Sequence, residues 1–163
     1  MVTIRRAEVA DVPAITQIYN EAILTTTATF DIEPKTEEDR LQWFASHDER
    51  HPILVAEVEG QVVGWTSLSQ WRQRAAYDDT AETSSYVQAQ HRGKGIGRKL
   101  KHAIIDEARR LGFHTLIAGV AQGSDASLHL NKCFGFTVVG TFKEVGHKFG
   151  KRLDVTYLQL FLD

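Results

Sequence analysis

A run of glycines and basic residues in the middle of the chain has the composition of a phosphate-binding loop. It extends from Gln90 to Leu100, reads QHRGKGIGRKL, and has glycines at three alternate positions. Glycine lets the backbone turn tightly and approach a ligand closely, because no Cβ stands in the way. The free N–H groups at the start of a helix favour a negatively charged ligand. With the mobile positive charge of the loop's lysines and arginines, they would form a site for a phosphate or pyrophosphate.

Two better-known phosphate loops do not match this stretch. A dinucleotide-binding loop needs the spacing G-x-G-x-x-G after the first strand, with an acidic residue about 20 residues later. Here the glycines follow the spacing G-x-G-x-G in mid-chain, and Arg98 stands in place of the third glycine. The G-x-x-x-x-G-K-[ST] loop is absent, because no Gly-Lys pair is followed by Ser or Thr. The element that fits is Gln90-x-x-Gly93-x-Gly95.

The elements that must position this loop follow from the hydrophobic pattern. Strand patterns cover residues 2–5, 53–58, 62–68, 82–87, 115–120, 137–142 and 154–160. Helix patterns begin at Asp11, at Thr36, behind the glycine loop, and at Ser124 or Asp125. Gly112 is expected to end the third helix in a left-handed conformation. The order β-α-α-β-β-β-α-β-α-β-β predicts one α/β domain over residues 1–163, an α+β arrangement on a mixed sheet.

Composition narrows the classes of function. A net charge of −2 argues against nucleic acid or an anionic membrane as the main partner, and 42% hydrophobic residues are ordinary for a globular protein. No apolar run is long enough to span a bilayer. The single cysteine, Cys133, excludes an internal disulfide and is consistent with the cytoplasm; we expect a buried thiol that only packs. The histidines show no metal-ligand spacing, so we expect no metal site.

The glycine element resembles the Q/R-x-x-G-x-G/A motif of the GNAT superfamily of acyl-CoA-dependent N-acetyltransferases. Further segments resemble its phosphinothricin acetyltransferase branch, which acetylates glutamate-analogue amino acids such as phosphinothricin and methionine sulfoximine. These segments are residues 18–22, 26–30, 71–72, 82–87, 92–97, 145–154 and 158–160. The resemblance covers nearly the whole chain. It implies the GNAT fold, acetyl-CoA as co-substrate, and acetyl transfer to the α-amine of a small glutamate-like or methionine-derived amino acid.

The resemblance also implies where acetyl-CoA binds. The glycine loop would hold the pyrophosphate, and the backbone of residues 85–87 would pair with the pantetheine arm. The expected contacts are Ser85, Tyr86, Val87, Arg92, Gly93, Lys94, Gly95, Ile96, Gly97, Arg98, Ser124 and Asn131. A backbone N–H of Tyr86 or Val87 would stabilise the tetrahedral oxyanion.

Two of these positions depart from the branch. Ser124 stands where the branch usually has Asn, and its hydroxyl can still make one hydrogen bond to the pantetheine. Asn131 stands where the branch more often has His, and where many family members use a tyrosine to protonate the departing thiolate. An amide is a poor acid, so the source of that proton is left open.

Glu82 is the candidate general base. From Glu82 to Ala89 a strand advances about 23 Å at roughly 3.3 Å per residue, comparable to an extended pantetheine. A carboxylate at Glu82 could therefore lie near the thioester and take a proton from the substrate ammonium, directly or through a water. It matches the glutamate to which the branch's chemistry is attributed. A neighbour such as Asp79 could raise its pKa; the alternative is that Asp78, Asp79 and Glu82 form a solvated turn.

The segment before Glu82 offers groups for the carboxylate of an amino-acid acceptor. Arginine can hold a carboxylate through two parallel hydrogen bonds, and Arg72 is a stronger candidate than Arg74. The expected acceptor contacts are Arg72, Gln73, Arg74, Thr83, Ser84, Phe30 and Tyr77. The alternative for each arginine is an ordinary surface charge.

Two other functions stay open on the sequence. One is a GNAT enzyme acting on another amine, such as a polyamine, an aminoglycoside or a protein N-terminus. The other is a non-catalytic module that binds acyl-CoA, which Glu82 disfavours and Asn131 keeps open. Because the branch usually forms homodimers, we expect a homodimer.

Overall fold

The structure is a computed structural model that describes residues 1–163. Its strands are β1 (Val2–Arg6), β2 (Ile53–Val58), β3 (Gln61–Gln70), β4 (Thr80–Val87), β5 (Thr115–Ala121), β6 (Thr137–Lys148) and β7 (Lys151–Phe161). Its helices are α1 (Val12–Thr25), α2 (Glu37–Ala45), α3 (Ile96–Arg110) and α4 (Asp125–Cys133). Three short 3₁₀ turns lie between them. The predicted order of strands and helices is confirmed.

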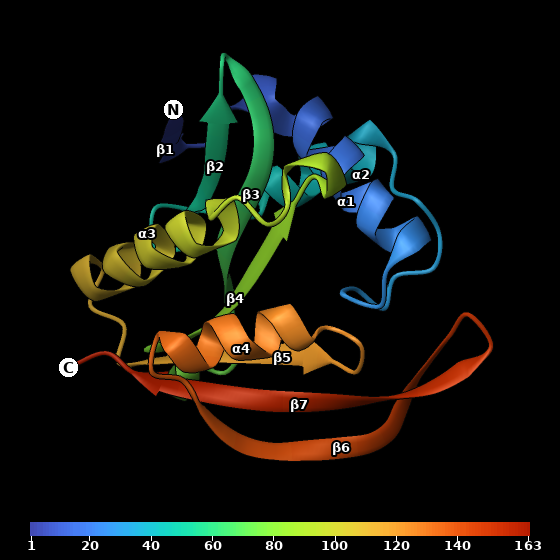
Figure 1. The fold of residues 1–163 in the computed structure, drawn as a ribbon. Coiled ribbons are helices and arrows are strands. Elements are labelled where there is room, and N and C mark those ends of the chain that lie inside the picture. The colour runs from blue at the N-terminus through green and yellow to red at the C-terminus, as the bar shows by residue number, and fades with distance from the viewer.

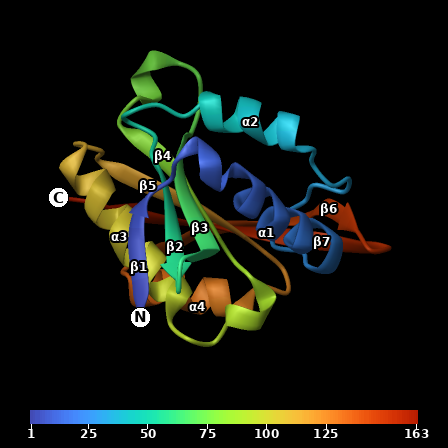
Figure 2. The same ribbon diagram turned by 90° about the horizontal axis from the view of Figure 1, so that it is seen from above.

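The strands form one sheet with helices on both faces (Figures 1 and 2). The strand order is β1-β2-β3-β4-β5-β7-β6, and every neighbouring pair is antiparallel except β4 and β5. Alternate side chains of β2 enter different cores: Val55 packs with α1, whereas Leu54 packs with α3. We call the face covered by α1 and α2 the α1 face, and the face covered by α3 and α4 the α3 face.

Helix α3 is held by its apolar stripe. Leu100, Ile104 and Ala108 recur at four-residue intervals and are fully buried against the sheet. Burying a leucine or isoleucine side chain stabilises the fold by about 1.5–3 kcal/mol. Gly112 follows with a φ of 84°, as predicted for the residue that ends the helix.

The sheet opens between β4 and β5, because their pairing is short. Only Thr80, Ala81 and Glu82 of β4 pair with β5, opposite residues 115–117. On its other side β4 pairs with β3 along its length, as far as Val87 opposite Gly64. The backbone of residues 83–87 therefore has an unpaired edge on the side of β5, and Figure 1 shows the two strands diverging there.

The two closing strands are longer than the sequence predicted. The apolar pattern ended at Phe142, yet β6 continues through a polar stretch to Lys148. The register shifts between Phe142 and Gly146, and Glu144 has a φ of 54°. This bulge is stabilised by the Asp154 carboxylate, which accepts the Glu144 N–H at 2.8 Å. Residues 143–148 contain one large apolar side chain, Val145, and so leave no hydrophobic alternation, which is why the pattern missed them.

Candidate active site

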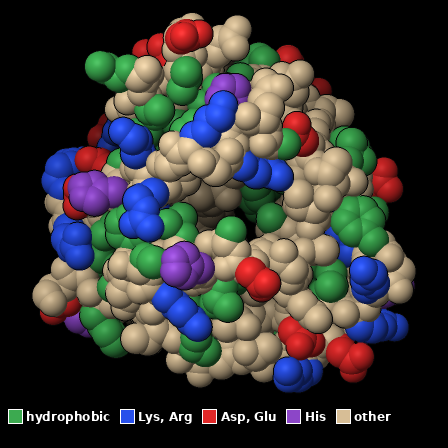
Figure 3. Space-filling model, viewed as in Figure 1, with side chains coloured by type: hydrophobic (Ala, Val, Ile, Leu, Met, Phe, Trp, Pro, Cys, Tyr) green, Lys and Arg blue, Asp and Glu red, His purple; other side chains and the backbone are tan.

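A cavity of about 320 Å³ lies where β4 and β5 separate. Strand β4, strand β5, α3, α4, β7 and the loop after α1 all contribute to its wall. A second cavity of about 540 Å³ adjoins it through shared lining residues and extends to Arg92 beside the glycine loop. Figure 3 shows a hollow near the centre of the molecule, in the region between α3 and α4, with Lys and Arg side chains on its rim. The two cavities form a groove from the glycine loop to Glu82.

The glycine loop has the backbone conformation that its glycines predict. Gly93 and Gly95 have φ values of 74° and 82°, in the left-handed region that side chains disfavour. Gly95 is the N-cap of α3 and lies exposed, with open space where a Cβ would stand. Arg92 donates from Nε to the carbonyl of Val87 at 3.1 Å, which joins the loop to the end of β4. The helix start is thus presented to the surface.

The structure separates the loop residues into two groups. Gly93, Lys94 and Gly95 are exposed, whereas the side chain of Ile96 is buried in the core and leaves only its backbone for a ligand. Arg98 is not brought to the groove. Its guanidinium lies 5.7 Å from the centre of the Phe134 ring and borders a different cavity beside β1.

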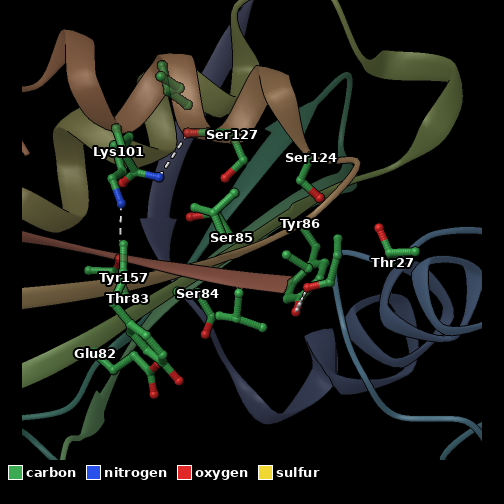
Figure 4. A pocket seen from close by; sticks show the side chains of 18 of the residues that line it. Thr27, Glu82, Thr83, Ser84, Ser85, Tyr86, Lys101, Ser124, Ser127 and Tyr157 are labelled. Atoms are coloured by element: carbon green, nitrogen blue, oxygen red, sulfur yellow. Dashed lines mark hydrogen bonds between the residues drawn. The ribbon is translucent and has the colours of Figure 1, made fainter. Parts of the chain in front are cut away.

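Glu82 lies on β4 at the last residue that pairs with β5, where the sheet opens. Its half-buried side chain lines the cavity and faces away from α3 and α4 (Figure 4). Burial raises the pKa of its carboxyl, because the charged form loses water, and the positive charge of Arg72 partly offsets this. Asp79 does not contribute to the pKa shift, so that expectation was wrong; its carboxylate lies 3.4 Å from Arg50 instead.

The predicted acceptor residues divide between two places. Phe30, Thr83 and Ser84 line the cavity that contains Glu82. Arg72, Gln73, Arg74 and Tyr77 surround a neighbouring depression after β3. The Arg72 guanidinium lies 3.9 Å from the centre of the Trp71 ring, and its charge acts on Glu82. Of this second group, Arg72 is therefore the residue with an electrostatic effect on the cavity.

Residues near the C-terminus fix the loop after α1 that walls the cavity. Lys148 is buried and donates from Nζ to the carbonyls of Thr26 and Thr29, at 2.9 and 2.8 Å. The ring of Phe30 covers Gly146 so closely that a Cβ there would lie 2.4 Å from it. The β6 segment of the 145–154 stretch thus positions the wall of the cavity that contains Phe30.

Four residues with polar or ionisable side chains line the cavity but were not predicted as site residues: Thr27, Lys101, Ser127 and Tyr157. Lys101 carries the clearest signal in the sequence, because it lies in the apolar stripe of α3 between Leu100 and Ile104. A lysine at such a position must bury its charge or find a partner.

The predicted pantetheine contacts on α4 also face the cavity. Ser124 is the N-cap of α4 and uses no side-chain hydrogen bond to cap it, so its hydroxyl is left for other partners. Asn131 is buried and donates from Nδ2 to the carbonyl of Ser127 at 2.9 Å. Its Oδ1 has no hydrogen-bond partner, which is costly for a buried polar atom.

Comparison with known proteins identifies the family. Residues 15–136 match the model of the acetyltransferase (GNAT) family. The chain belongs to the GNAT family of acetyltransferases. It is 44% identical to an L-methionine sulfoximine/L-methionine sulfone acetyltransferase of Salmonella typhimurium, over 99% of this chain and 95% of that protein. It is 36% identical to a phosphinothricin N-acetyltransferase of Streptomyces coelicolor, over 97% and 95%.

A solved structure supports the same conclusion. An acetyltransferase of Salmonella typhimurium in complex with acetyl-CoA superposes with a TM-score of 0.97 at 43% identity, covering 100% of this chain and 95% of that one. The GNAT fold and acetyl-CoA as the co-substrate are thus confirmed. The groove of this chain fits such a ligand, because it joins an open helix N-terminus to an unpaired strand edge and to Asn131 Oδ1, which lacks a partner.

Three further features bear on the sequence predictions. Cys133 is exposed rather than buried, with its Sγ 3.4 Å from Nε2 of His129, so the expectation of a packed thiol was wrong. Cys133 lies two residues after the buried Asn131, and residues two apart on a helix face different sides, so Cys133 lies on the exposed side of α4. No cluster of three or more His, Cys, Asp or Glu side chains has the arrangement of a metal site. None of the helices is both long and apolar enough to cross a membrane.

Proposed function

We propose that this GNAT enzyme transfers the acetyl group of acetyl-CoA to the α-amine of a small amino acid of the methionine sulfoximine or phosphinothricin type. The observation on which the proposal rests most is a half-buried Glu82 at the end of a groove that begins at the glycine loop. The names of the relatives support the substrate class.

In the proposed reaction, the acceptor ammonium approaches from the α1 face. Glu82 takes one of its protons, directly or through a water, and its raised pKa makes it a better base than a solvated carboxylate. The neutral amine attacks the thioester carbon, and a backbone N–H on the unpaired edge of β4 stabilises the oxyanion. The N–H of Tyr86 faces β3 instead, because the Gln88 N–H pairs with Val63 and alternate N–H groups of a strand point the same way. The nitrogen–carbon bond forms, the nitrogen gives up a second proton to water, the carbon–sulfur bond breaks, and the thiolate needs a proton.

Arg72 is proposed to hold the acceptor carboxylate. Its charge already reaches Glu82, so a carboxylate held there would bring the α-amine of the same molecule to the base. Ser84 and Phe30, in the Glu82 cavity, are proposed to complete the acceptor pocket.

The substrate class is tested by an acceptor panel. Thiol release from acetyl-CoA would be measured with methionine sulfoximine, phosphinothricin, a polyamine, an aminoglycoside and a peptide with a free N-terminus. The proposal predicts the highest kcat/KM for the two amino acids, with the acetyl group found on their α-nitrogen by mass spectrometry. A preference for the polyamine, aminoglycoside or peptide would replace the proposed substrate. An absence of turnover with every amine, despite acetyl-CoA binding, would favour a non-catalytic module.

We further propose that residues 1–163 form a single catalytic domain that acts in the cytoplasm as a homodimer. The one continuous sheet and the single unpaired cysteine support the first two statements. Strand β6 supports the third, because it is a sheet edge with exposed apolar side chains, namely Val138, Val139, Phe142 and Val145. Light scattering should give twice the chain mass, and Phe142→Glu should reduce it to one chain. A wild-type protein of single-chain mass would contradict the dimer.

A further inference from the structure

Lys101 is the one charged residue on the buried side of α3. Only 4% of its surface is exposed, and its Nζ donates to Oγ1 of Thr83 at 3.0 Å. The nitrogen also lies 4.4 Å from the centre of the Phe136 ring. No carboxylate lies within ion-pair distance of Nζ. Burial without a counter-charge favours the neutral amine and lowers the pKa of Lys101 to about 7.

Lys101 lies at the wall of the cavity as well as at the edge of the core. Its side chain lines the same cavity as Glu82, but from the opposite side of β4. Successive residues of a strand point to opposite faces, so Glu82 faces away from α3 while Thr83 faces Lys101. Figure 4 shows this arrangement, with Glu82 below β4 and Lys101 above it, joined to Thr83.

The direction from which acetyl-CoA enters decides which face receives the sulfur. The groove begins at the N-terminus of α3 and passes Ser124 and Ser127 of α4, which lie on the α3 face. From Val87, beside the loop, to Thr83 the strand advances about 13 Å at roughly 3.3 Å per residue. A co-substrate lying along that edge has its sulfur on the α3 face, and the amine arrives from the other.

The other candidates for a proton donor in the cavity are weaker. Burial raises the pKa of Tyr86 further above its ordinary value, and its hydroxyl donates to the carbonyl of Ala28. The amide of Asn131 has no proton to give at neutral pH. The ring of Tyr157 packs 5.9 Å from that of Trp71, whose neighbour Arg72 acts on Glu82, so it belongs to the acceptor side.

We propose that Lys101 is the catalytic acid that protonates the departing CoA thiolate, with Thr83 positioning its ammonium group. The proposal rests on the proposed acetyl transfer. As the carbon–sulfur bond breaks, the sulfur keeps the electron pair and takes a proton from Nζ, which becomes a neutral amine. The nitrogen gives up its second proton to water as the amide forms. Glu82 has gained one proton and Lys101 has lost one, so exchange with water after product release restores both, and one proton is released overall. The thiol leaves as CoA-SH, and no other reactant is needed.

The first test compares Lys101→Met, which keeps the length of the side chain but has no proton to donate, with Lys132→Met on the exposed side of α4. General acid catalysis contributes about 10²–10⁴-fold. We expect kcat to fall by about that factor in Lys101→Met, with the dissociation constant of acetyl-CoA unchanged by calorimetry, and no change in Lys132→Met. A weakened acetyl-CoA affinity with a normal kcat would overturn the proposal, because Lys101 would then only hold the co-substrate.

The pH profile separates a proton donor from a packing residue. In the wild type kcat should fall as pH rises through about 7, since the neutral amine cannot donate. This descending limb should be absent from the residual activity of Lys101→Met. A Lys101→Cys variant in a Cys133→Ser background, alkylated in denaturant with bromoethylamine and refolded, carries a less basic ammonium at the same place. It should regain activity with the limb displaced to lower pH.

The outcomes distinguish this proposal from the one on which it rests. If wild type and Lys101→Met have equal kcat and the same descending limb in their pH profiles, the assignment of Lys101 is wrong, while the proposed acetyl transfer still stands. If the wild type transfers acetyl to an amine other than an amino acid, the same comparison is made with that amine. If it transfers acetyl to none, both proposals are wrong.

Discussion

The two faces of β4 carry ionisable groups of opposite charge, and burial shifts the pKa values of these groups in opposite directions. On the α1 face burial raises the pKa of Glu82, and on the α3 face it lowers that of Lys101. Each shift favours the neutral form. Glu82 keeps a charged neighbour in Arg72, whereas Lys101 has only a hydroxyl in Thr83.

The difference follows from where the sheet opens. A paired strand would separate its two faces completely, but β4 loses its β5 partner after Glu82, and a cavity joins the two sides there. A proton acceptor and a proton donor can therefore reach one thioester from opposite faces of the strand. In the proposed mechanism the amine lies on the α1 face and the sulfur on the α3 face.

The largest expected effect comes from removing the base on the α1 face. Glu82→Gln keeps the shape of the side chain but cannot accept a proton, so kcat should fall about 10²–10⁴-fold. The defect should shrink as pH rises, because more of the amine then arrives neutral. Steady-state rates at several pH values check this, with acetyl-CoA affinity as the control. A loss of less than a few-fold, with a pH profile parallel to that of wild type, would remove Glu82 from the mechanism.

A smaller effect, on acetyl-CoA binding, is expected from a change in the glycine loop, where the groove along the α3 face begins. In Gly95→Val a β-branched residue must adopt a φ of 82°, which would distort the N–H groups of the loop. Loss of one or two charge-assisted hydrogen bonds should weaken acetyl-CoA binding about 10- to 100-fold by calorimetry. Gly60→Val is a matched control, since Gly60 has a φ of 79° and equally open space in the β2–β3 turn. Equal affinity in the two variants would exclude the loop.

A third change is expected on the acceptor side alone. Arg72→Ala should raise KM about 10-fold for an amino acid but much less for its carboxyl amide, since only the acid loses a charged partner. Because Arg72 lowers the pKa of Glu82, the ascending limb of the pH profile should also move to higher pH. Equal effects on acid and amide would show that Arg72 does not bind the carboxylate.

The smallest expected effect is on stability. The folded-state pKa of Glu82 lies above its unfolded value, so the folded protein loses stability as pH rises through that window. Glu82→Gln should therefore be more stable than wild type at neutral pH, with the advantage lost below about pH 4. Urea denaturation at both pH values measures it. A destabilised Glu82→Gln at neutral pH would mean that contacts of the charged carboxylate outweigh the cost of its burial.

The sequence predicted the features that depend on local pattern. The glycine loop, the helix behind it and Gly112 at its end are set by spacing within a few residues, and the structure has each of them. The order of elements also followed, because turns and caps lie at their boundaries. The end of β6 did not, since a mostly polar strand with a bulge at Glu144 leaves no periodic signal.

The site was predicted less evenly than the fold. Glu82 was found from its distance to the loop along one strand, whereas Arg72 and Phe30 needed the resemblance to a family. Lys101 was missed, because a lysine on a helix is usually solvated and only its place in the apolar stripe indicated burial. Its partner Thr83 was assigned to the acceptor, and that it faces α3 depends on which way β4 is turned in the sheet.

The positions of the acceptor nitrogen and the CoA sulfur on the two faces of β4 can be observed directly with a bisubstrate analogue. A crystal structure would be determined with methionine sulfoximine joined through its α-nitrogen to the sulfur of CoA by an acetyl-length linker. We expect the sulfur to lie on the α3 face within hydrogen-bond distance of Lys101 Nζ, roughly 3–3.5 Å, and the nitrogen to face Glu82 directly or through one water. A linker that runs outside the opening between β4 and β5, with the sulfur remote from Lys101 and the nitrogen remote from Glu82, would contradict it.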